Sequence, residues 1–246
     1  MRALVVTHTP QEGPGLLAEW LPAAGLELDV LRPYAGDAVP VALTEHDALI
    51  VMGGPQQAWD DDSAPWLAAT KELLRTLVAA RTPVLGICLG AQLLAEATGG
   101  VVEPGADGPE LGARLVGKRD VAGADPLLWD TPMSWVCVQW HWDAVTELPP
   151  GATLLASSPR YENQAFRVGT RAWGLQFHVE APEELVRTWA AEDADGVRAA
   201  GLDPDRLVER TVAELPEVAD LWRPVLERFA AVVRGEDPRP TALPLV

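Results

Sequence analysis

Short apolar runs alternate with helix-like segments over the first hundred residues of the chain. Strand-like apolar runs lie at 3–7, 26–31, 48–52 and 83–87. Between and after them, apolar residues recur every three or four positions, as on one face of an amphipathic helix, at 13–24, 64–81 and 90–97. This alternation is typical of βαβ units, which build a parallel sheet.

The pattern changes after residue 100. Short extended segments separated by Gly and Pro lie at 112–117, 135–138, 153–156 and 172–178. We expect them to be antiparallel or mixed strands added to the same sheet. Beyond Pro182, three amphipathic helices are predicted at 183–200, 204–214 and 218–234.

Composition limits the classes of partner. The chain has 36 Asp and Glu against 19 Lys and Arg, a net charge of −17, so neither nucleic acid nor an anionic membrane is an expected partner. No apolar run approaches the roughly 18 to 20 residues of a membrane span, and no cleavable apolar segment opens the sequence. Two cysteines, Cys88 and Cys137, are too few for a disulfide framework, and we expect a reducing, cytoplasmic location.

A candidate nucleophile lies between a predicted strand and a predicted helix. Residues 83–94 read Pro-Val-Leu-Gly-Ile-Cys-Leu-Gly-Ala-Gln-Leu-Leu, with Cys88 at the turn. Gly86 and Gly90 flank Cys88 two positions away on either side, where the missing side chains let the turn close and leave the sulfur accessible, as in a nucleophile elbow. The free amides at the start of the helix favour the thiolate.

A candidate base follows a later apolar run. His178 and Glu180 are two residues apart, and in an extended segment their side chains share a face. Glu180 then accepts a hydrogen bond from one imidazole nitrogen while the other faces Cys88. The best sources of an oxyanion hole are the Leu89 amide and an amide in the loop 52–55. All these parts lie at predicted strand ends, where open α/β sheets place their sites.

Each part also has a purely structural interpretation. An isolated cysteine after an apolar strand is more often a small buried hydrophobe, and an isolated histidine at a strand end is usually structural. The joint occurrence of Cys88, His178 and the Gly53-Gly54 pair in this order favours a catalytic site. Cys137 has no glycine neighbours and is predicted to lie in the core.

These motifs resemble the class I glutamine amidotransferases, most closely the stand-alone branch that is similar to the glutaminase domain of GMP synthase. The matching stretches are 52–55, 59–67, 83–100, 140–143 and 174–180. The resemblance covers residues 1–190 and implies an α/β fold: a flavodoxin-like three-layer sandwich with a mixed, mostly parallel central sheet. Residues 191–236 are expected to form a helical C-terminal extension of the same domain, and 237–246 a flexible tail.

The resemblance implies a role for each motif residue. Cys88 would attack the side-chain carboxamide of glutamine, with the amides of Gly54 and Leu89 stabilising the oxyanion. His178, oriented by Glu180, would protonate the departing ammonia and then activate the water that cleaves the thioester.

Further residues are candidates for substrate binding: Gly53, Gln92, Trp140 and His141. Gln92 matches a family position that contacts substrate, and its alternative is an ordinary helix-surface residue. Trp142 stands where the branch has Gly, which changes the substrate rim, and Val179 stands where the family has Pro. Trp140, Trp142 and Asp143 are candidates for lining the pocket, although packing is the favoured role of either indole. The acidic triplet 60–62 is either a solvated loop or attracts an amine.

Three functions follow. The first is a glutaminase that delivers ammonia to a separate synthetase or acceptor subunit, since no synthetase region is visible. The second is a self-sufficient γ-glutamyl hydrolase or peptidase. The third is an inactive binding protein, against which the intact Cys, His and Glu positions weigh. A homo-oligomer is compatible with each.

Other chemistries fit the sequence less well. Thiol proteins of the intracellular-protease type have a histidine directly after the cysteine, where this chain has Leu89. The four histidines, at 8, 46, 141 and 178, lack the short spacing of a zinc site. No phosphate loop or dinucleotide fingerprint occurs, so neither a metal nor a cofactor is expected.

Overall fold

A nine-stranded sheet forms the centre of the computed structural model, which describes residues 1–239. In spatial order its strands are β2 (Glu27–Leu31), β1 (Arg2–Val6), β3 (Ala48–Val51), β4 (Val84–Ile87), β11 (Ala172–Leu175), β10 (Ala165–Val168), β9 (Thr153–Ser157), β6 (Glu110–Lys118) and β7 (Ser134–His141). A separate ribbon pairs β5 (Val101–Pro104) with β8 (Asp143–Glu147).

The sheet is mixed. The five neighbouring strands from β2 to β11 run parallel, and β10, β9, β6 and β7 continue it by antiparallel pairing. This confirms the predicted parallel first half and the antiparallel strands added to the same sheet. The predictions missed β5, β8 and β10, which are short and lack a sustained apolar run.

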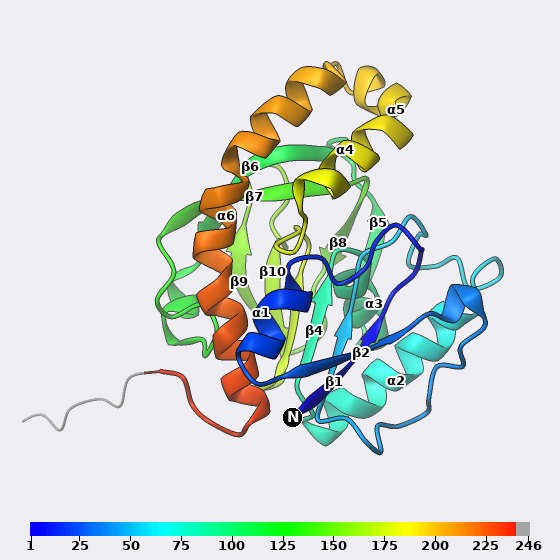
Figure 1. The fold of residues 1–246 in the computed structure, drawn as a ribbon, viewed down its shortest axis with the longest axis vertical. Coiled ribbons are helices and arrows are strands. Elements are labelled where there is room, and N and C mark those ends of the chain that lie inside the picture. The colour runs from blue at the N-terminus through cyan, green and yellow to red at the C-terminus, as the bar shows by residue number, and fades with distance from the viewer. Residues whose placement is uncertain (240–246) are drawn as a thin grey trace, which may run out of the picture.

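Helices cover both faces of the sheet (Figure 1). They are α1 (Leu17–Ala23), α2 (Trp66–Ala80), α3 (Leu89–Ala97), α4 (Glu183–Glu192), α5 (Ala194–Ala199) and α6 (Pro204–Val233), with short 3₁₀ turns at Pro33–Ala35 and Asp120–Ala124. Because successive strand residues point to opposite faces, Leu4 and Val6 pack with α2 and α3, whereas Val5 packs with α1 and α6. The predicted three-layer α/β fold is thereby confirmed.

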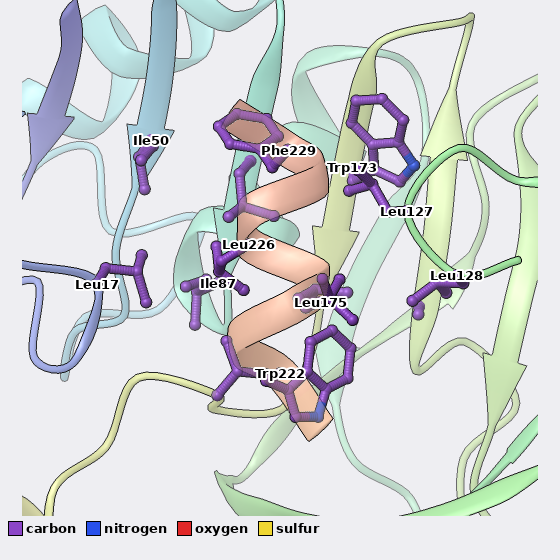
Figure 2. Close-up of a cluster of buried hydrophobic side chains, with 14 of the residues drawn as sticks. Leu17, Ile50, Ile87, Leu127, Leu128, Trp173, Leu175, Trp222, Leu226 and Phe229 are labelled. Carbon is purple, nitrogen blue, oxygen red and sulfur yellow. The ribbon is translucent and has the colours of Figure 1, made fainter. Parts of the chain in front are cut away.

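The core beneath α6 packs against the ends of two central strands of the sheet. Figure 2 shows Trp222, Leu226 and Phe229 of α6 facing Ile87 and Leu175, the last residues of β4 and β11. All five side chains are buried, and each contributes about 1.5–3 kcal/mol through removal from water. These two strands end where the candidate site begins.

Helix α6 corrects the sequence prediction. Two helices were expected at 204–214 and 218–234, but one helix runs through Pro216 and Pro224. A proline inside a helix costs about 3 kcal/mol because it removes a backbone hydrogen bond and crowds the preceding turn. Buried residues on both sides of Pro216 keep one face of the helix against the sheet, and this packing offsets the cost.

Two other helices differ from their predicted bounds. The helix predicted at 13–24 begins at Leu17, because Gly15 has a positive φ of 51° and the Leu16 amide donates to the Glu180 carbonyl at 2.9 Å. The helix predicted at 183–200 is interrupted at Asp193, which separates α4 from α5.

The predicted division of the chain falls within a helix. Helix α4 crosses residue 190, and the assignment of 1–190 and 191–236 as parts of one domain stays a prediction. The tail predicted at 237–246 lies outside the described residues from 240 onward. Among residues 1–239, no helix combines the length and apolar character needed to cross a bilayer.

Candidate active site

Cys88 lies at a sharp turn between β4 and α3. Its backbone has φ 50° and ψ −108°, a left-handed conformation that side-chain-bearing residues rarely adopt. Such strain persists only where the surrounding structure enforces it, and it concentrates at functional sites. The Cys88 amide donates to the Leu175 carbonyl at 2.8 Å, and the Cys88 carbonyl accepts from Ala91 at 2.9 Å, which fixes the turn from both sides.

Two glycines make the turn possible. A Cβ on Gly86 would stand 2.5 Å from the Gly90 carbonyl oxygen, and a Cβ on Gly90 would stand 2.0 Å from the Val51 carbonyl oxygen in β3. Both distances lie far inside van der Waals contact with backbone atoms. The turn therefore needs glycine at both positions, as predicted for an elbow.

His178 and Glu180 follow β11 and are both 2% exposed. The His178 amide donates to the Val138 carbonyl of β7 at 2.8 Å. This hydrogen bond joins the segment that follows β11 to strand β7. Its Nδ1 lies 2.7 Å from Glu180 Oε1, and the other carboxylate oxygen accepts from the Val179 amide at 2.9 Å. Both carboxylate oxygens of Glu180 are thus engaged, which fixes the orientation of the imidazole.

The imidazole faces the cysteine. A Cβ on Gly53 would stand 3.0 Å from His178 Cε1 and 3.6 Å from Cys88 Cβ, so both side chains converge over this glycine. Burial alone lowers the pKa of His178, but charge interactions and hydrogen bonds with Glu180 and Cys88 raise it well above its usual value. The arrangement favours an imidazolium that is ready to donate a proton.

The loop after β3 supplies amide donors beside the cysteine. A Cβ on Gly54 would stand 2.7 Å from His8 Cβ and 3.1 Å from Leu89 Cδ2, so Gly54 lies close against the start of α3. Among the hydrogen bonds of residues 1–239, neither the Gly54 amide nor the Leu89 amide donates to another group of the chain. Two free amides beside Cys88 can serve as an oxyanion hole.

A cavity of about 570 Å³ opens above these groups. Its wall includes Cys88, His178, Gly54 and three of the four residues predicted to bind substrate: Gln92, Trp140 and His141. Gln92 is 3% exposed, and its amide nitrogen donates to the Asp143 carbonyl and to Gln176. It is a residue of the cavity wall rather than of the helix surface.

Gly53 is the one predicted substrate-binding residue that does not line the cavity, and His141 and Trp142 differ in how exposed they are. Gly53 lies beneath the Cys88 and His178 side chains rather than on the cavity wall. His141 is buried, with Nδ1 2.8 Å from the Asp143 carbonyl and Nε2 3.3 Å from Glu110 Oε2, so both ring nitrogens already have partners. Trp142, 43% exposed, lies on the rim and donates to Asp193 at 3.1 Å.

Several cavity residues were not identified from the sequence. Glu12, Trp189, Glu192 and Asp193 line the cavity, and the Trp189 indole donates to Glu12 Oε1 at 3.1 Å across 177 positions of sequence. Glu12 lies in an irregular loop and Trp189 in an amphipathic helix, so neither has a local motif. Only a hydrogen bond between distant parts of the chain identifies this pair.

Cys137 occupies a different environment from Cys88. It is fully buried in the core, and burial, with a smaller contribution from the charge of Glu110, raises its pKa well above the usual value. The predicted core position is confirmed. Neither cysteine forms a disulfide.

Comparison with known families covers most of the chain. The family model for glutamine amidotransferase class-I matches residues 16–188, a range that contains the whole cluster around Cys88. A solved glutamine amidotransferase from Thermotoga maritima is 30% identical, with a TM-score of 0.83 over 94% of this chain and 98% of that one. This likeness confirms the flavodoxin-like fold.

Relatives with different functions also match. The glutamine amidotransferase-like protein YfeJ of Salmonella typhimurium is 33% identical over 202 residues, 79% of this chain and 84% of the relative. Gamma-glutamyl peptidase 3 of Arabidopsis thaliana is 31% identical over 147 residues, 58% of each chain. The glutamine-hydrolysing GMP synthase of Porphyromonas gingivalis is 32% identical over 187 residues, 75% of this chain and 35% of the synthase. This chain therefore belongs to the class I glutamine amidotransferase family.

Proposed function

We propose that the protein is a thiol-dependent hydrolase of γ-glutamyl amides, glutamine among them, with Cys88 as its nucleophile. One observation carries the proposal: a strained elbow cysteine and a buried His178–Glu180 pair converge at one open cavity. Strain, a buried ion pair and access to solvent rarely coincide unless a reaction requires them.

The proposed reaction has two halves. The Cys88 thiolate attacks the side-chain carbonyl carbon, and the developing oxyanion accepts hydrogen bonds from the amides of Gly54 and Leu89. His178 donates its proton to the departing nitrogen as the C–N bond breaks, which leaves a γ-glutamyl thioester. The neutral imidazole then takes a proton from a water molecule as this water attacks the thioester carbon. The C–S bond breaks, and glutamate leaves. Glu180 holds the imidazole and stabilises its charged form.

The relatives and the cavity support two classes of substrate. Hydrolysis of glutamine for a separate synthetase or acceptor subunit is supported by the synthase relative, since this chain aligns with about a third of that protein. Self-sufficient cleavage of larger γ-glutamyl amides is supported by the peptidase relative and by the cavity. About 570 Å³ falls within the range of pockets that hold ligands larger than one amino acid.

Steady-state assays of the purified protein with glutamine and a panel of γ-glutamyl dipeptides test this function. We expect amide hydrolysis without any nucleotide or metal added. Glutamine turnover only in the presence of another protein favours the subunit role, and cleavage of dipeptides by the protein alone favours the self-sufficient role. If no amide is hydrolysed and a glutamine-like electrophile does not label Cys88, the proposal is refuted. The inactive binding protein, the third function considered from the sequence, would then be favoured.

Replacement of Glu180 by Gln is expected to lower kcat about 100-fold while changing KM less than about threefold. The glutamine side chain removes the charge that stabilises imidazolium and presents an amide N–H to Nδ1, which favours the wrong tautomer. Steady-state kinetics measure both constants. Glu183→Gln, an exposed acidic residue at the start of α4, is the matched control and should leave both unchanged. Equal changes in kcat and KM for Glu180→Gln would argue against the orienting role.

Three predictions concern the location and the partners of the protein, and they stay predictions. A cytoplasmic, reducing location stays a prediction from two unpaired cysteines. The same holds for a separate acceptor subunit and for a homo-oligomer.

A further inference from the structure

One wall of the cavity lies beside the imidazole that would protonate the leaving group. We define this leaving-group wall as Glu12, Trp189, Glu192 and Asp193, all of which line the cavity. The Trp189 ring lies 4.5 Å from the His178 ring. A Cβ on Gly53 would stand 3.0 Å from both Glu12 Oε2 and His178 Cε1. An amine that accepts its proton from His178 therefore departs along this wall.

The carboxylates of this wall form no salt bridge within the described residues, and the only basic side chains of the cavity wall are two histidines, His178 among them. Among residues 1–239, no salt bridge within 4.0 Å joins Glu12, Glu192 or Asp193 to Lys, Arg or His, and the cavity wall contains neither Lys nor Arg. Burial raises the pKa of Glu12. The charge of His178 and the Trp189 hydrogen bond oppose this rise, and the charges of Glu180 and Glu192 add to it. A cationic ligand would relieve this repulsion.

Indole rings adjoin two of these carboxylates through their N–H groups, since Trp189 donates to Glu12 and Trp142 donates to Asp193. Trp189 stacks on Trp140 with ring centroids 5.7 Å apart, and both rings line the cavity. The Trp142 indole, held by its hydrogen bond to Asp193, continues this surface to the rim. The carboxylates attract an ammonium group by charge, and an indole face that lines the cavity adds a cation–π interaction where the ammonium group reaches it.

Gln92, elsewhere on the cavity wall, offers a place for the glutamyl end. The Gln92 side chain is 97% buried, and among the hydrogen bonds of residues 1–239 its oxygen accepts none, although its nitrogen donates twice. This oxygen is therefore available to accept a hydrogen bond from a ligand in the cavity. With the glutamyl group held at Gln92 and its amide carbon at Cys88, the rest of the substrate extends toward the leaving-group wall.

We propose that the leaving-group wall binds a second positive charge on the departing amine, so that the preferred substrates are γ-glutamyl amides of diamines or other cationic amines. This inference rests on the proposed function. The chemistry is the same hydrolysis: the S–C bond forms, the C–N bond breaks, His178 protonates the amine nitrogen, and water releases glutamate. The distal ammonium takes no part in bond making and only positions the substrate.

A matched pair of amides tests the inference. One is the mono-γ-glutamyl amide of a four-carbon diamine, and the other is the γ-glutamyl amide of pentylamine, in which a methyl group replaces the distal ammonium. We expect kcat/KM to be at least about tenfold higher for the charged amide at low ionic strength. The preference should shrink as salt is added, because salt screens the attraction.

Substitution of single carboxylates in the leaving-group wall tests whether they cause the preference for the charged amide. Glu12→Gln keeps an acceptor for the Trp189 indole, and Glu192→Gln removes an exposed charge, so neither should disturb the fold. Each should lower the ratio of kcat/KM for the charged amide to kcat/KM for the neutral amide about threefold or more. Glu184→Gln, on the same helix but outside the cavity, is the matched control and should leave the preference unchanged.

The outcomes separate this inference from the proposed function. Equal kcat/KM for the two amides would overturn the inference and leave the hydrolase intact. If no amide is hydrolysed, the hydrolase proposal fails, and calorimetric titration of the Cys88→Ala protein with both amides decides the remaining question. Tighter binding of the charged amide would still support the cation site, whereas equal binding, or no binding of either, would overturn it.

Discussion

Replacement of Cys88 by Ala is expected to lower kcat/KM for a γ-glutamyl amide by at least about 10⁴-fold, because no other group near the cavity can form the thioester. Folding should be preserved. The Cys88 side chain borders an open cavity, so its loss extends an existing space rather than leaving a closed void. Cys88→Ser should be nearly as inactive, since a hydroxyl is not ionised by this histidine at neutral pH.

The second cysteine supplies a matched control. Cys137→Ala removes the same atom from the closed core, where Cys137 is 0% exposed. It should keep full activity and lose about 1–3 kcal/mol of unfolding free energy. The two variants thus separate chemistry from packing. Hydrolysis retained by a well-folded Cys88→Ala protein would reject the mechanism.

Replacement of Gly90 by Ala is expected to cost about 4 kcal/mol or more of unfolding free energy, or to prevent folding altogether. The added Cβ would stand 2.0 Å from the Val51 carbonyl oxygen and 2.6 Å from its carbon. Both are backbone atoms of β3, a central strand that pairs with β1 and β4. Relief of the clash therefore requires α3 to move away from the sheet.

Urea denaturation measures this effect, with Gly123→Ala as the control. A Cβ on Gly123 would meet nothing within 4 Å, and its φ is not positive. That variant should stay within about 0.5 kcal/mol of the parent protein. If Gly90→Ala proved as stable as Gly123→Ala, the close approach of helix and strand that forms the elbow would be wrong.

The reactive cluster could be predicted because its parts are local. Gly86, Cys88 and Gly90 belong to one strand-turn-helix segment, and His178 and Glu180 share an extended segment. A parallel sheet brings the carboxyl ends of β4 and β11 together, and the sequence pattern predicted those strands. Periodicity and turn chemistry therefore sufficed for this part of the site.

The leaving-group wall could not be predicted in the same way. Glu12 and Trp189 meet where an N-terminal loop contacts α4, and the Leu16 amide donates to the Glu180 carbonyl nearby. The single helix α6 was missed for a related reason. Its prolines argue for a break, and only the buried face against the sheet keeps the helix continuous. Tertiary packing decided both features.

The most direct test of the proposed mechanism is to trap the intermediate. The protein is mixed with a γ-glutamyl amide, quenched with acid during turnover, digested, and mapped by mass spectrometry. We expect the mass of one γ-glutamyl group on the peptide that contains Cys88, removable by hydroxylamine as a thioester should be. Hydrolysis that proceeds with no adduct on Cys88, or with the adduct on Cys137, would contradict the account.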